Sequence, residues 1–266
     1  MAVLGIDASD PDEQIRNWEE QLKSDDKEAV ATAHMEIGKI YSNAKREFDK
    51  ALEHFNKAKE LTQDSIRILN INFSIANTYF LKEDFEKARE FYILILNAYK
   101  APEAMKIQAE FKIYDTYRKE GKYQKAIEGF RDFVEKHEDH NLAPFAQFLI
   151  GNIYLDIKQP DKAIPEFEKV LEKYKDSEIF DDAGLAMGNA FKDKGQYEKA
   201  IQYWLQFLEE YPECDAAAQI YFQIADTYKN NKKNCAEAVK FFQKILDNYP
   251  DNFLYSPAAY EAGMCY

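Results

Sequence analysis

Apolar and small residues recur along this chain with a period of 37 or 38 residues. An alanine marks each period, at Ala51, Ala88, Ala126, Ala163, Ala200 and Ala238. Aromatic residues stand four positions after each alanine (Phe55, Tyr92, Phe130, Phe167, Trp204, Phe242) and nine or ten before it (Tyr41, Tyr79, Tyr117, Tyr154, Phe191, Tyr228). Three positions earlier comes a small residue at Gly38, Ala76, Gly151, Gly188 and Ala225, with Tyr114 as the exception. Because residues three or four apart share one face of an α-helix, the pattern predicts two short helices per period, A and then B.

This periodicity predicts an all-α fold of six helix-turn-helix repeats. Their expected bounds are about 29–63, 68–101, 104–139, 143–176, 180–212 and 217–250. Residues 255–266 match helix A of a truncated seventh repeat, so the array is expected over 29–266. Residues 1–28 precede it, and Asp10 followed by Pro11 is typical of a helix start. We therefore expect an N-terminal tail followed by a helix that caps the first repeat.

The pattern resembles the tetratricopeptide repeat family from about Ala33 to Tyr266. The resemblance implies a right-handed α-α superhelix, a solenoid in which the small residue of helix A and the alanine of helix B let the two helices approach closely. It also implies that the aromatic residues fill the space between repeats and that the A helices line a concave face. The sequence departs from the family in its period, which exceeds the usual ~34 residues, as in tetratricopeptide proteins of bacterial envelopes. The family's loop glycine is kept only at Gly121 and Gly195.

Composition and charge narrow the possible partners. Hydrophobic residues at 46%, with 15% aromatic, are enough to bury a continuous core. The formal net charge is −13. Because an acidic surface repels phosphates and anionic headgroups, we expect no nucleic acid partner and no membrane partner.

The N-terminus and the cysteines indicate the cell compartment in which the protein is expected. The first residues lack the positive segment and the apolar core of a signal peptide. Cys214, Cys235 and Cys265 have no ligand-like spacing, and we interpret them as free thiols in a reducing compartment. A cytoplasmic protein is expected, with a periplasmic location as the alternative if a signal peptide has been removed.

The sequence contains no pattern typical of a nucleophile, a phosphate-binding loop or a metal site. His137 and His140 resemble a ligand pair most closely. However, His137 occupies the place of Tyr99, Tyr174, Tyr211 and Tyr249 in other repeats, so we interpret it as a packing residue. We expect no catalytic residue, no metal, no cofactor and no enzyme activity.

The resemblance implies that the exposed face of the A helices, on the concave side, is the binding groove. In the first three repeats it comprises Thr32, Met35, Glu36, Lys39, Ser42, Asn43, Asn70, Phe73, Ser74, Asn77, Phe80, Leu81, Gln108, Phe111, Lys112, Asp115, Arg118 and Lys119, and the other repeats continue it. Across all six repeats this face contains six basic and six acidic residues, and phenylalanine recurs at one equivalent place, which suits a segment with apolar anchors. The predicted partner-binding residues are Phe73, Asn77, Phe80, Phe111, Arg118, Lys119, Phe145, Phe148, Asn152, Leu155, Asn189 and Phe222.

We therefore predict a non-catalytic scaffold or adaptor that binds a protein or peptide partner in an apolar, Phe-rich groove. Each phenylalanine could instead pack against a neighbouring helix. One alternative function is a regulatory or assembly-factor portion of a larger protein, either an enzyme or a bacterial envelope complex. Another is a self-assembling scaffold, a homo-oligomer joined through the C-terminal helix, which would expose Tyr260 and Tyr266.

Overall fold

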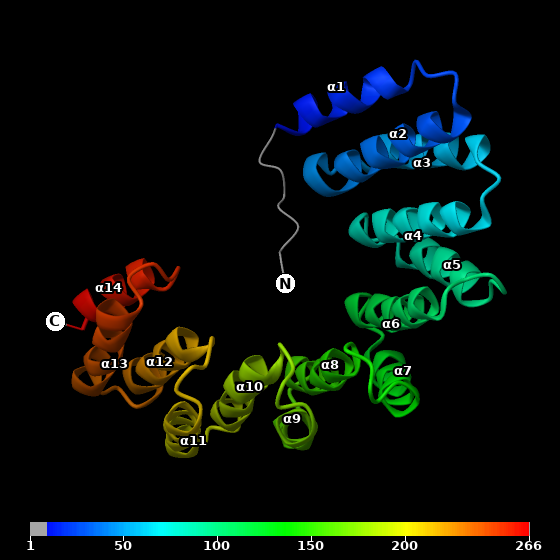
Figure 1. Ribbon diagram of the computed structural model, residues 1–266. Coiled ribbons are helices and arrows are strands. Elements are labelled where there is room, and N and C mark those ends of the chain that lie inside the picture. The colour runs from blue at the N-terminus through cyan, green and yellow to red at the C-terminus, as the bar shows by residue number, and fades with distance from the viewer. Residues whose placement is uncertain (1–9, 266) are drawn as a thin grey trace. The chain divides into compact units, whose positions relative to one another are not determined.

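The computed structural model describes residues 10–265, and every regular element among them is helical (Figure 1). These residues form fourteen α-helices and two short π-helical segments, which confirms the all-α prediction. The expectations for residues 1–9 and for Tyr266 lie outside the described residues. The chain divides into two compact units, Met1–Ala126 and Ile127–Tyr266, and the boundary falls within α7 (Tyr123–Lys136).

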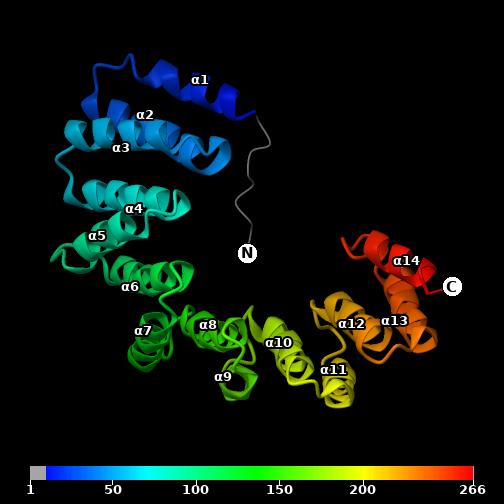
Figure 2. The same ribbon diagram turned by 180° about the vertical axis from the view of Figure 1, so that it is seen from behind.

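The first unit stacks its helices in chain order (Figure 1, Figure 2). They are α1 (Pro11–Gln21), α2 (Lys27–Ile40), η1 (Tyr41–Lys45), α3 (Phe48–Leu61), α4 (Ser65–Leu81), α5 (Phe85–Leu96) and α6 (Glu103–Lys119). Helix α2 packs against α1 and α3, and α5 packs against α4 and α6. Asp10 caps α1 as predicted, because its side chain accepts a hydrogen bond from the backbone amide of Asp12 at 3.1 Å.

The second unit continues the same alternation. Its helices after α7 are α8 (Ala143–Asp156), α9 (Pro160–Lys173), α10 (Phe180–Asp193), α11 (Tyr197–Glu210), α12 (Ala217–Asp226), η2 (Thr227–Asn231), α13 (Cys235–Asn248) and α14 (Tyr255–Gly263). Helix α9 packs against α8 and α10, and α13 packs against α12 and α14. The A helices are therefore α2, α4, α6, α8, α10 and α12. None of the helices described in 10–265 is long and apolar enough to cross a membrane.

The recurring small and aromatic residues form the core of each repeat. All six anchor alanines are 0% exposed, and the six aromatic residues four positions later are at most 1% exposed. Where the small residue of the A helix is a glycine, it lies directly against that ring: a Cβ built on Gly38 would come within 2.7 Å of Phe55. At Gly188 the Cβ would come closer still to Trp204. The missing side chain is what lets helices A and B touch, as the repeat pattern predicted.

Each A helix of the six repeats ends in the same left-handed turn. The residue five before the anchor alanine has a positive φ in every repeat: Arg46, Glu83, Gly121, Lys158, Gly195 and Lys233. The next backbone amide donates to the carbonyl of the A-helix aromatic residue, for example Asp84 to Tyr79 at 2.9 Å. This Schellman arrangement satisfies a carbonyl that the helix end would leave unpaired. The turn is therefore kept even where the loop glycine is absent from the sequence.

The first and sixth repeats contain one extra residue between the A-helix aromatic residue and the anchor alanine. The structure accommodates it in the π-helical segments η1 and η2, at the ends of α2 and α12. A π-helical turn takes up one inserted residue locally. The amides of Glu47 and Asn234 still donate to the carbonyls of Tyr41 and Tyr228, each at 2.8 Å. The variation between nine and ten residues thus leaves the turn between A and B intact.

Tyr99 does not pack in the way expected of His137, its equivalent in the third repeat. Tyr99 is 97% exposed, because α5 ends at Leu96 and the tyrosine follows in a turn. In the equivalent place of the third repeat, α7 continues to Lys136. The ring of His137 there lies 4.8 Å from that of Phe133, centroid to centroid. A B helix that ends early leaves this aromatic position without the helix turn that would hold it.

Candidate partner-binding site

The predicted binding residues all lie on A helices. In the first unit, α4 carries Phe73, Asn77 and Phe80, and α6 carries Phe111, Arg118 and Lys119. In the second unit, α8 carries Phe145, Phe148, Asn152 and Leu155, α10 carries Asn189, and α12 carries Phe222. Phe111 is buried, Lys119 is exposed, and the other ten are partly buried.

The recurring phenylalanines contact the core of their own repeats. Phe73 meets Tyr92 edge-on, with ring centroids 5.6 Å apart. Phe148 lies 5.6 Å from Phe167, and Phe222 lies 5.5 Å from the equivalent ring of the sixth repeat. Each of the three rings therefore packs on the B helix of its own repeat rather than standing free on the surface. Because each stays partly exposed, its outer edge is the part that a partner can contact.

Three A helices of the first unit converge on a cavity of about 380 Å³. Its walls are Met35 and Lys39 of α2, Asn70, Phe73 and Ser74 of α4, and Met105 and Gln108 of α6. All of these except Met105 belong to the face predicted from the repeat pattern. The exposed amides of Asn70 and Gln108 contribute polar groups to a wall that also contains two methionines and a phenylalanine. Pockets that bind ligands combine apolar walls with a few polar groups in this way.

Other predicted residues of the first unit are engaged within the fold. The hydroxyl of Tyr92 donates to Asn77 Oδ1 at 2.5 Å, and the ammonium of Lys112 lies over the Phe80 ring, 5.3 Å from its centroid. Arg118 pairs with Asp115 one turn earlier on α6, at 2.6 Å. The basic pair predicted at Arg118 and Lys119 therefore presents one cation that is already neutralised beside one that is exposed.

In the second unit a lysine links two A helices. Lys192 of α10 donates to Gln223 at 3.1 Å and to Asp226 at 2.6 Å, both near the end of α12. Asn152, Asn189 and Leu155 lie partly buried on their helices.

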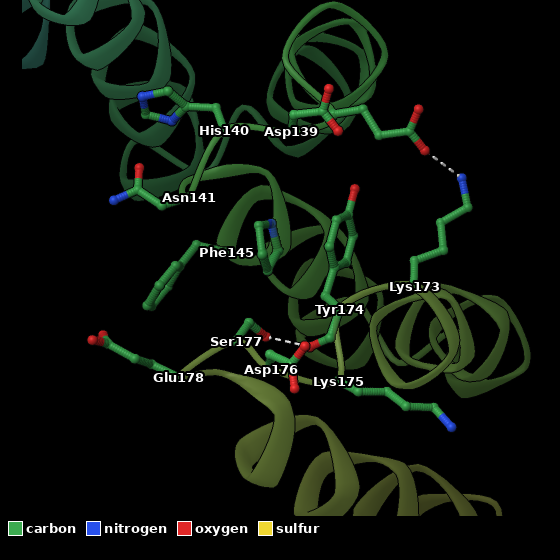
Figure 3. Close-up of a pocket in the computed structure, with 12 residues that line it drawn as sticks. Asp139, His140, Asn141, Phe145, Lys173, Tyr174, Lys175, Asp176, Ser177 and Glu178 are labelled. Carbon is green, nitrogen blue, oxygen red and sulfur yellow. Dashed lines mark hydrogen bonds and ion pairs between the residues drawn. The ribbon is translucent and has the colours of Figure 1, made fainter.

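Phe145 also lines a larger cavity of about 680 Å³, between the loops that precede α8 and α10 (Figure 3). Lys173 and Glu138 pair across its rim at 2.8 Å. The Tyr174 hydroxyl is buried and has no hydrogen-bond partner among the described residues. Burial, together with the nearby Glu138 carboxylate, raises the pKa of Tyr174, so the phenol stays protonated at neutral pH. This cavity differs from the one in the first unit in having acidic side chains in its walls in addition to basic ones.

Sequence reasoning missed two features. Met105 lines the first cavity although it lies one turn before Gln108, the first residue of α6 on the expected face. Its place in the wall depends on how close α4 and α6 lie, which the sequence does not give. His34 of α2 and His54 of α3 lie with their Nδ1 atoms 3.0 Å apart. Burial lowers the pKa of both, that of His54 to about 4. The lowered pKa of both rings favours neutral imidazoles at pH 7, one of which then donates to the other. Residues 10–265 contain no group of three or more His, Cys, Asp or Glu side chains placed to hold a metal ion.

Comparison with known proteins gives matches in sequence and in fold. A family model described as "Tetratricopeptide repeat" matches residues 112–178 and 185–253, together half of the chain. A tetratricopeptide repeat protein from Parabacteroides merdae is similar over 82% of this chain and 79% of its own, with a TM-score of 0.57 and 17% identity.

Two further solved structures share the fold. RapI in its apo form is similar over 89% of this chain and 96% of its own, with a TM-score of 0.56 and 13% identity. A chain of the APC/C hetero-tetramer Cut9-Hcn1 is similar over 96% of this chain and 46% of its own, with a TM-score of 0.54 and 14% identity. No match was found among curated proteins.

Proposed function

Since this chain belongs to the tetratricopeptide repeat family, we propose that it is a scaffold whose first unit holds a segment of a partner protein between α2, α4 and α6. Proteins of this family are generally scaffolds for protein–protein interaction, and their fold is generally non-catalytic. The observation that carries the proposal is the cavity of about 380 Å³ on the A-helix face of the first unit.

The walls of the cavity indicate the chemistry of the segment. Met35, Phe73 and Met105 offer apolar surface for one inserted side chain. The amides of Asn70 and Gln108 can donate to and accept from the backbone of an extended peptide. The segment therefore carries a leucine, methionine or phenylalanine anchor with free backbone groups on either side.

The charged residues of the A helices indicate which charge the partner segment carries, and the size of the anchor indicates its affinity. Lys39 is already paired with Glu36 at 2.7 Å, and Arg118 with Asp115, so exposed Lys119 favours one acidic residue in the partner. One buried anchor contributes roughly 1.5 to 3 kcal/mol before the costs of ordering the segment. Because one anchor supplies only part of the roughly 8 kcal/mol that a micromolar complex requires, the expected affinity is micromolar or weaker.

The test is selection from a displayed library of random peptides. The parent should enrich peptides with an apolar anchor. A variant carrying Asn70→Arg and Gln108→Arg should lose them, because both residues line the cavity and two arginines would occupy its entrance. The matched control carries Glu86→Gln and Glu90→Gln on α5, which are exposed and raise the net charge by the same amount. This control should keep the selected peptides, with little dependence on salt.

The proposal fails if the selected peptides bind the arginine variant as well as the parent while that variant keeps its circular dichroism spectrum. It also fails if binding depends on the α5 acids, because the contact surface would then be the acidic B helices.

A further inference from the structure

An aromatic cluster in the fifth repeat borders a cavity of about 190 Å³ between α9, α10 and α11. The residues that line it are Leu171, Phe180, Tyr203, Gln206, Phe207, Glu210 and Tyr211. The rings of Phe180, Phe207 and Tyr211 contact one another, with centroids 4.9 to 5.8 Å apart. Pockets for drug-sized ligands have roughly 300–1,000 Å³, so this cavity suits the end of one side chain better than a whole small molecule.

The walls of this cavity favour a positively charged group. The described residues that line it include one carboxylate, that of Glu210, and no basic side chain. Glu210 accepts a hydrogen bond from the Tyr211 hydroxyl at 3.2 Å and forms no ion pair with a lysine or arginine of residues 10–265. Burial, Tyr211 and the carboxylates of Glu168 and Glu210 raise the pKa of Tyr203, so a second carboxylate lies nearby. Aromatic rings attract cations to their faces, and the carboxylates act in the same direction.

The sixth repeat shows what occupies the equivalent place there. The ammonium of Lys244 lies over the Tyr221 ring, 5.1 Å from its centroid, and the ring of Tyr249 is 6.3 Å from that of Tyr221. Tyr249 is equivalent to Tyr211, because each follows its anchor alanine by eleven positions. Lys244 follows its anchor by six positions, and the residue in that place of the fifth repeat is Gln206. The fifth repeat therefore keeps an aromatic cluster and lacks the lysine that contacts it in the sixth.

Phe207 supplies the ring that Tyr221 supplies in the sixth repeat. Gly184 of α10 has the place of Tyr221, 37 residues earlier, and a Cβ built on Gly184 would overlap the Phe207 ring. The fourth repeat again has a lysine six positions after its anchor, and Lys169 there pairs with Glu166 at 2.6 Å. In both neighbouring repeats a lysine of helix B thus meets an aromatic or acidic group, and in the fifth repeat such groups remain without it.

We propose that this cavity binds a lysine or arginine side chain of a partner protein. The cationic end lies against the rings of Tyr203 and Tyr211 and pairs with Glu210. The occupant belongs to a protein segment, because the cavity holds one cationic end while exposed Gln206 and Glu210 at its rim can bond the backbone on either side. The site lies in the second unit and takes a charged anchor, so the inference does not rest on the function proposed for the first unit.

The test is selection of displayed random peptides on the 266-residue chain, with counter-selection on its Gln206→Lys variant. That substitution supplies from within the chain the lysine that the sixth repeat has, so it should occupy the cavity. Peptides that bind the parent and not this variant should carry lysine or arginine. Replacing that residue with norleucine keeps an unbranched apolar side chain and removes the charge, and it should weaken binding at least about tenfold.

Three variants of the protein separate this site from general attraction between a cationic peptide and an acidic chain. Glu210→Gln, at an exposed position, should weaken binding several-fold. Gln202→Lys lies one turn earlier on α11, is exposed and changes the net charge as much as Gln206→Lys, yet it should keep the peptide. The variant Asn70→Arg with Gln108→Arg should also bind the peptide, which separates this site from the cavity of the first unit.

The inference is overturned if no selected peptide distinguishes the parent from Gln206→Lys, or if the norleucine peptide binds as well as its cationic counterpart. Equal losses in Gln202→Lys and Gln206→Lys would also overturn it, because the attraction would then reflect net charge alone. Unchanged binding to Glu210→Gln is a further contradiction, and it decides the matter if Gln206→Lys loses its circular dichroism spectrum.

Discussion

Replacing Gly188 with alanine should destabilise the second unit, because the added methyl group would overlap the indole of Trp204. Three indole atoms would lie within 2.5 Å of the new Cβ. Trp204 is 0% exposed, so the ring has no free space into which to move. Its Nε1–H also donates to the carbonyl of Leu185 at 3.1 Å, and a displaced ring would lose this hydrogen bond.

The expected change in the free energy of unfolding is the sum of three contributions. Forcing extra volume into a packed core costs about 1–3 kcal/mol. A buried donor left without its acceptor costs about 1–3 kcal/mol. The higher helix propensity of alanine relative to glycine offsets about 1 kcal/mol of this loss. The expected net loss at Gly188 is therefore about 3 kcal/mol, or a fall in melting temperature of roughly 6–12 °C, and Gly188→Leu should lose more.

The assay is urea unfolding followed by circular dichroism and by Trp204 fluorescence, in a Trp18→Phe background that leaves one reporter. Gly263→Ala is the matched control, because its new methyl group would meet nothing within 4 Å. It should unfold at the parent's midpoint or slightly above it. A Gly188→Ala variant as stable as this control would show that helices A and B do not meet at Gly188.

Three other substitutions test the turn, the histidine pair and the buried carboxylate. Lys158→Gly should stabilise the fold by about 0.5–1 kcal/mol in urea unfolding, since glycine relieves a left-handed backbone at φ 59°; an unchanged midpoint would mean that the turn carries no strain. The pKa of His54 is about 4 in the folded state and about 6.5 in the unfolded state. Between these pH values the unfolded state binds more protons than the folded state, so the stability of the first unit should fall as the pH drops from about 6.5 toward 4. Urea midpoints of His54→Gln should depend less on pH, and equal slopes would contradict the assignment. Glu166→Ala should cost about 1–3 kcal/mol in urea unfolding, because buried Gln147 donates to this carboxylate at 2.7 Å. A loss that disappears in 1 M salt would instead indicate a screened surface pair.

The repeat pattern could be read from the sequence because its contacts are local. Each repeat packs mainly on its neighbours, so the spacing of Gly188, Ala200 and Trp204 is enough to predict which of these residues contact one another. No contact between distant parts of the chain was needed to place them, and the structure buries Ala200 and Trp204 completely, as their spacing predicts.

The turns show where residue type is a weaker guide than backbone hydrogen bonding. Glycine at Gly121 and Gly195 indicates a left-handed turn, but Glu83 and Lys158 do not, and all four adopt it. The amide that follows each of them satisfies a helix-end carbonyl, so the common helix ending outweighs the local preference of the residue.

The binding surface is the part that only the tertiary structure decided. The sequence by itself determined that the A helices present phenylalanines at one repeating place, because helical periodicity sets the face on which a residue lies. It did not determine that Phe111 is buried while Phe73 lines a cavity beside Met105, nor that His34 and His54 meet. Those outcomes depend on the distance between neighbouring helices and on the rotamer that each side chain adopts against them. Both are set by packing across helices, which decides whether a ring fills the core or stays partly exposed.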